Sequence, residues 1–106
     1  MTIEDVIRRI GEIGIVPVVR AATAEEATRA VEAICAGGIP IVEITMTVPN
    51  ATSVIRHVVR EHGNAALIGA GTVTSAEQAE QWGHQIKPYN KEAQLWKFLL
   101  EINCYT

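Results

Sequence analysis

Three short apolar runs recur along this sequence at a nearly constant spacing, and an amphipathic helical pattern follows each of them. The runs are Ile15 to Val19, Ile41 to Thr45 and Ala65 to Ile68, and successive runs start about 26 residues apart. Strands that alternate with helices through short loops indicate a parallel sheet with right-handed crossovers. The pattern predicts an α/β fold, either part of a (β/α)8 barrel or an open doubly wound sheet. A complete barrel needs roughly 200 residues or more, and this chain has 106.

Apolar residues at helical spacing and capping residues set the expected boundaries of the helices. Residues 3–12 precede the first run, Thr23 caps a helix that ends at Gly37-Gly38, Pro49-Asn50 opens the next, and Thr74 or Ser75 caps another. Apolar residues recur every three or four positions in the first three helices: Ile3, Val6, Ile7 and Ile10; Ala27, Ala30, Val31 and Ile34; Val54, Ile55, Val58 and Val59. We expect these stripes to face the core.

The overall composition is that of a soluble globular domain, and it excludes several classes of protein. The net charge of −3 gives no basic footprint for nucleic acid. No apolar run is long enough to span a membrane, and residues 1–9 lack the apolar core of a signal peptide, so we expect a cytoplasmic protein. Cys35 and Cys104 have no metal-ligand spacing, so no metal site is predicted and Cys35 is interpreted as a buried structural thiol.

The composition changes abruptly at about Gln81. Residues 1–81 contain no lysine and no aromatic residue. The last 25 residues hold all three lysines and all five aromatics: Lys87, Lys91, Lys97, Trp82, Tyr89, Trp96, Phe98 and Tyr105. We therefore expect a domain over 1–81 and a divergent tail over 82–106. Residues 82–89 show neither the helical nor the strand period, and we expect a helix at 90–102.

Polar residues follow each of the three apolar runs, where parallel strands would bring them to one edge of the sheet. Glu43 lies inside the second run, and a buried carboxylate is costly unless it is paired, hydrogen-bonded or used. Desolvation would raise the pKa of Glu43 and suit it as a general base. The alternative is a structural ion pair with Arg20, which follows the first run. Arg20 itself is either a solvated loop cation or a clamp for an anionic substrate.

Four stretches in this order resemble the N-terminal part of the 2-keto-3-deoxy-6-phosphogluconate (KDPG) and 4-hydroxy-2-oxoglutarate aldolases. They are Ile15-Val-Pro-Val-Val-Arg20, Ala36-Gly-Gly-Ile39, Val42-Glu-Ile-Thr-Met-Thr-Val-Pro49 and Ile68-Gly-Ala-Gly-Thr-Val-Thr74. The resemblance implies an incomplete (β/α)8 barrel, commonly assembled as a trimer in the family. It also implies a class I aldolase that forms pyruvate and an aldehyde through a lysine Schiff base, without metal or cofactor.

The resemblance carries site roles to individual residues. Glu43 maps onto the family's proton-transfer residue, Arg20 onto the arginine that holds the pyruvate carboxylate, and Thr72 onto the threonine that lines the same pocket. Thr45, Thr47 and Gly71 are expected to contact the substrate, a small keto acid. The loop sequence Met46-Thr47-Val48-Pro49 is typical of a branch of the family that lacks an arginine there.

No lysine matches the family's Schiff-base position, which lies in the second half of the barrel. The three lysines of the tail fall in no stretch that resembles the family's lysine strand. We therefore expect a truncated, inactive form of the aldolase, produced by a frameshift or a fused end. A non-catalytic interaction or assembly module built from a half-barrel is the alternative, and a marginally folded product without activity is a third possibility.

Overall fold

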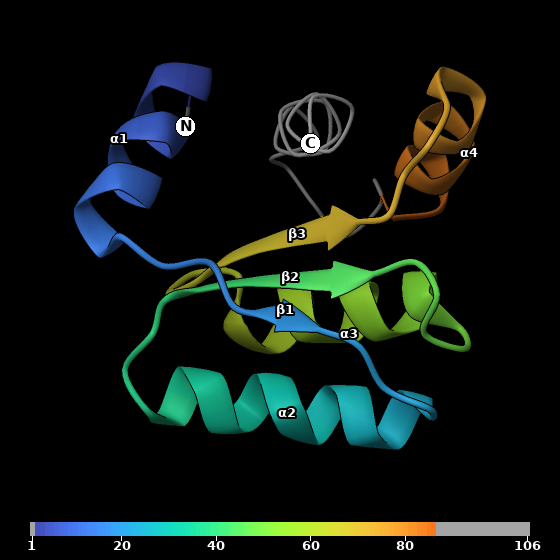
Figure 1. Cartoon of the computed structure of the whole chain (residues 1–106), viewed down its shortest axis with the longest axis horizontal. Helices are drawn as coiled ribbons and strands as arrows, with labels where there is room; N and C mark the ends of the chain where they lie inside the picture. The colour runs from blue at the N-terminus through green and yellow to red at the C-terminus, as the bar shows by residue number, and fades with distance from the viewer. Residues whose placement is uncertain (1, 87–106) are drawn as a thin grey trace.

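The computed structural model describes residues 2–86 and shows three βα units preceded by a helix (Figure 1). Its strands form one parallel sheet in the order β1-β2-β3, which confirms the α/β fold. The sequential strand order, with α2 and α3 side by side on one face of the sheet, is that of part of a (β/α)8 barrel. The elements are α1 (Ile3–Ile13), β1 (Val18–Val19), α2 (Ala24–Ala36), β2 (Ile41–Thr45), α3 (Ala51–His62), β3 (Leu67–Gly71) and α4 (Ala76–Ile86).

The outer face of the sheet carries the main core. Val42 and Ile44 of β2 are buried there against the predicted stripes of α2 and α3, which lie side by side beneath the sheet (Figure 1). In α2 the buried members of the stripe are Ala27 and Val31, and in α3 they are Val54, Ile55 and Val58. These two stripes are therefore confirmed, and burial of their apolar surface is the main force that holds the helices on the sheet.

Helix α1 lies on the opposite, inner face, at the amino ends of the strands. Its residue Val6 is buried with Ile41 of β2 and Leu67 of β3 in a second, smaller cluster. The Arg9 side chain donates a hydrogen bond of 3.2 Å to the Ala65 carbonyl, which ties the helix to the start of β3. Ile7 is 52% exposed, so the apolar face of α1 is narrower than the sequence predicts.

Three element boundaries differ from the sequence predictions. β1 is only Val18–Val19, although the Glu43 amide donates to the Pro17 carbonyl at 2.9 Å just before it. β3 is Leu67–Gly71 rather than 65–68, because pairing with β2 continues through its glycines. Helix α4 continues to Ile86, into the stretch where no period is predicted, and at its start Ser75, one of the two predicted caps, accepts from the Gln78 amide.

The tail prediction lies mostly outside the described residues. The helix expected at 90–102, Cys104 and the three lysines all fall beyond residue 86. Trp82, where the composition changes, packs against the outer cluster. It lies within α4, although the sequence predicts no helical period there. No helix within 2–86 combines the length and apolar character needed to cross a membrane.

Candidate active site

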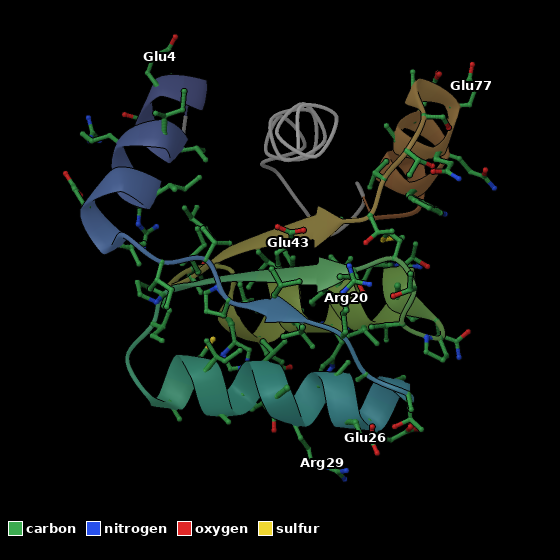
Figure 2. All side chains as sticks on the ribbon, in the orientation of Figure 1. Glu4, Arg20, Glu26, Arg29, Glu43 and Glu77 are labelled. Carbon is green, nitrogen blue, oxygen red and sulfur yellow. The ribbon has the colours of Figure 1, made fainter. Side chains whose placement is uncertain are left out.

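Glu43 lies on the carboxyl half of the inner face, which helix α1 does not cover. Neighbouring residues on a strand point to opposite faces. Since Val42 and Ile44 are buried against α2 and α3, Glu43 points to the inner side, as Figure 2 shows. Helix α1 covers only the amino half of this face. Glu43 is therefore half-buried, and its register partner Val18 is 53% exposed.

The Glu43 side chain lies over the backbone of Gly71 on β3. A β-carbon placed on Gly71 would lie 2.7 Å from Cδ and 3.0 Å from Cγ of Glu43, and would collide with its Oε1. Gly71 pairs with Thr45, whereas Glu43 itself pairs with Gly69. The carboxylate therefore extends from the Glu43 backbone past its register partner Gly69 and toward the carboxyl end of the sheet.

The end of β2 is held by hydrogen bonds on both sides of Met46. Thr45 is 1% exposed, and its hydroxyl lies 2.7 Å from the hydroxyl of the exposed Thr47. The Met46 amide donates to the Gly71 carbonyl at 2.9 Å, which joins this turn to the end of β3. The structure thus brings Thr45, Thr47 and Gly71 together, as expected for a shared site.

Thr72 follows directly and has a left-handed backbone with φ of 60°. This conformation is unusual for a β-branched residue, and such strain concentrates at turns and functional sites. Thr72 is half-buried, at the same edge of the sheet as the Glu43 carboxylate. The backbone outlier supports the assignment of Thr72 to the site, which rests on the resemblance.

Arg20 comes immediately after β1, at the same edge (Figure 2). Its side chain is exposed, and within residues 2–86 no ion pair joins it to Glu43. The structural ion pair that the sequence offered as an alternative is therefore not formed here. A guanidinium in this position can take a carboxylate ligand in a bidentate contact.

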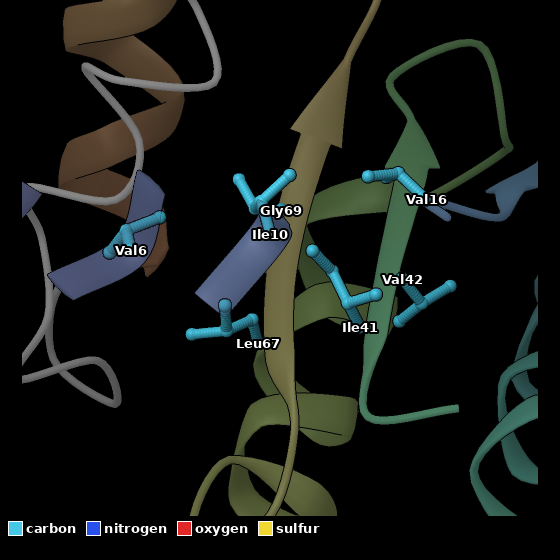
Figure 3. Close-up of a pocket in the computed structure, with 7 residues that line it drawn as sticks. All are labelled: Val6, Ile10, Val16, Ile41, Val42, Leu67 and Gly69. Carbon is cyan, nitrogen blue, oxygen red and sulfur yellow. The ribbon is translucent and has the colours of Figure 1, made fainter. Parts of the chain in front are cut away.

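An apolar cavity lies under α1, and it is separate from the polar edge (Figure 3). Val6 and Ile10 of α1 line it together with Ile41 and Leu67 of the sheet. Its space of about 10 Å³ admits at most one water molecule. The cavity is a packing gap beneath the helix and offers no room for a substrate.

Cys35 lies on α2, on the outer side of the sheet and away from the face that carries Glu43. Within residues 2–86 no group of three or more His, Cys, Asp or Glu side chains could hold a metal ion. Cys35 is a free thiol that packs against the outer cluster, and burial raises its pKa. It is half-buried, so it is less enclosed than the sequence predicts.

Residues 5–85 match a family model described as "Aldolase: KDPG and KHG aldolase". The chain belongs to the KDPG and KHG aldolase family. The match includes all or most of every described element and contains all six residues assigned to the site from the sequence. A search of curated proteins gives no match to this chain.

Sequence reasoning missed two features of this aldolase-family site. The first is Val18, an exposed residue beside Glu43. Its place next to Glu43 is known only from the register in which β1 pairs with β2. The second is the contact between Glu43 and Gly71. Glycines at alternate positions, Gly69 and Gly71, are a signal that could have indicated it, because they leave one face of a strand without side chains.

Proposed function

We propose that residues 5–85 form the proton-transfer half of a class I aldolase site for KDPG or 4-hydroxy-2-oxoglutarate. The family match supports aldolase chemistry. The observation that carries the proposal is the Glu43 carboxylate, which projects from the inner face and lies against Gly71, the last residue of β3.

Glu43 would act on a substrate held as an imine at its C2 carbonyl. The carboxylate removes the proton of the C4 hydroxyl, the C3–C4 bond breaks, and its electrons pass to the imine nitrogen to give an enamine. The aldehyde leaves, and the protonated Glu43 returns a proton to C3. Hydrolysis of the imine then releases pyruvate.

Arg20 would bind the carboxylate of the keto acid, because guanidinium and carboxylate match in charge and geometry. Thr45, Thr47, Gly71 and Thr72 would line the rest of this end of the site. Titration of the ¹⁵N-labelled chain with pyruvate tests this arrangement. We expect amide shifts at these residues that disappear in Arg20→Gln and persist in Arg29→Gln, an exposed arginine on α2 (Figure 2). Equal shifts in both variants would contradict the assignment.

The imine needs a primary amine, and residues 1–86 contain no lysine. We infer that this chain by itself forms no Schiff base and is inactive as an aldolase, since the later lysines lie in no stretch that resembles the family's lysine strand. Incubation with pyruvate and borohydride, followed by mass spectrometry, should give no adduct. A stoichiometric lysine adduct accompanied by aldol cleavage would overturn this inference.

A non-catalytic assembly module is the second candidate, and the exposure of Val18 favours it. β1 and β3 are the two edges of the sheet formed by residues 2–86, and exposed edges promote pairing with another chain. Self-association, as a trimer by analogy with the family, would cover both the exposed Val18 and the edges of the sheet. Light scattering decides this candidate: a monomeric mass at high concentration would exclude it.

A further inference from the structure

We infer that Gly71 is a positioning residue for Glu43: the absence of a side chain at Gly71 allows the Glu43 carboxylate to reach the carboxyl end of the sheet. The catalytic meaning of this inference rests on the proposed function. The geometry itself does not, and the experiments below separate the two.

Backbone conformation does not explain a glycine at this position. Among residues 2–86 the glycines with positive φ are Gly14 and Gly38, so Gly71 has a conformation that any residue can adopt. Gly71 is also buried inside a paired strand, where glycine weakens the strand and usually marks a close approach by another group.

The approaching group is the Glu43 side chain. The three heavy atoms nearest to a β-carbon built on Gly71 are Oε1, Cδ and Cγ of Glu43. These atoms are the far end of a flexible side chain, so the carboxylate would move before the strand did. A side chain at position 71 should therefore displace the carboxylate and leave the fold in place.

The displacement would change the site, because Gly71 is level with Thr45 and next to Thr72. A carboxylate pushed off this position leaves the edge where Arg20 and Thr72 lie. A shift of about 1 Å at a reacting group can cost about a hundredfold in rate. Gly71 would thus influence catalysis through the position that it leaves to the Glu43 carboxylate.

Nuclear Overhauser effects (NOEs) between the Glu43 γ protons and the α protons of residue 71 test the geometry directly. We expect these NOEs in the wild-type chain, their loss in Gly71→Ala, and their retention in Gly11→Ala. Gly11 is a matched control, since a β-carbon there meets no atom within 4 Å. Absence of the NOEs in the wild type, or their persistence in Gly71→Ala, would overturn the inference.

If Gly71→Ala fails to fold, the double variant Gly71→Ala/Glu43→Ala decides the matter. Recovery of the fold in the double variant would support the inference, because the clash would then come from Glu43. An unfolded double variant would contradict it.

The catalytic consequence is measured separately with pyruvate in D₂O and added methylamine, which forms the imine in solution. We expect Gly71→Ala to slow deuteration of the pyruvate methyl group about tenfold to a hundredfold relative to Gly11→Ala. No catalysis by the wild-type chain would refute the proposed function and leave the NOE result standing. Full activity of Gly71→Ala would overturn the positioning role.

Discussion

Val18 of β1 and Glu43 of β2 are register partners on the inner face, and Val18 is 53% exposed. The next residue, Val19, is 4% exposed within the outer cluster against α2 and α3. Two adjacent valines thus separate a packed face from an open one. Among the described residues, the inner face beside Glu43 is thus less covered than the outer face.

This contrast predicts that replacing valine by threonine lowers stability much more at position 19 than at position 18. Val19→Thr should lower the free energy of unfolding by about 1–3 kcal/mol, because it buries a hydroxyl without a partner. Val18→Thr should change it by no more than about 0.5 kcal/mol, as is usual at an exposed site. Urea denaturation measures both values. Equal losses would mean that Val18 is covered in solution.

The hydrogen bond between Thr45 and Thr47 predicts that the exposed partner matters more for stability. Thr47→Val leaves the Thr45 hydroxyl buried and unpaired, which should cost about 1–3 kcal/mol. Thr45→Val leaves the Thr47 hydroxyl free to bind water and should cost less than about 1 kcal/mol. Thermal or urea unfolding of the two variants gives the comparison. A larger loss in Thr45→Val would contradict it.

The cap of α1 predicts a contribution to stability that depends on pH. The Thr2 backbone amide and hydroxyl both donate to the Asp5 carboxylate and hold its pKa below its ordinary value. The contribution is therefore complete above the ordinary pKa of an aspartate and is lost as the pH falls through the lowered pKa.

Melting curves of the wild type and Asp5→Asn measure this effect between about pH 7 and pH 3. The wild type should be the more stable at neutral pH, and the difference should shrink as the pH falls. Glu4→Gln, in the same first turn but outside the capping box, is the control and should keep the wild-type pH dependence. A difference between wild type and Asp5→Asn that grows toward low pH would contradict the assignment.

The sequence predicted the helix faces and the order of elements well, because both follow from local periodicity. Ala27 and Val31 of α2 were found from their spacing, and both are buried. Ile7 has the same spacing on α1 but is exposed, since α1 meets the sheet only at its amino edge. Periodicity identifies an apolar face and does not show how much of that face finds a partner.

The site was predicted as a set of residues, whereas its geometry depends on contacts between strands. Thr45 ends one apolar run, and Gly71 and Thr72 follow another, so their common edge could be expected from parallel topology. The approach of Glu43 to Gly71 depends on the register of β2 against β3. The third strand was placed two residues too early, so the sequence treated Gly71 as a loop residue.

The most direct test of the central claim is the methylamine-dependent deuteration of pyruvate, compared between the wild type, Glu43→Gln and Glu32→Gln. Glu32 is an exposed glutamate on α2 and serves as the matched control. We expect the wild type and Glu32→Gln to accelerate deuteration equally and Glu43→Gln to lose about 10²–10⁴-fold of that acceleration, the usual contribution of a positioned general base. An unchanged rate in Glu43→Gln would show that this carboxylate does not transfer the proton.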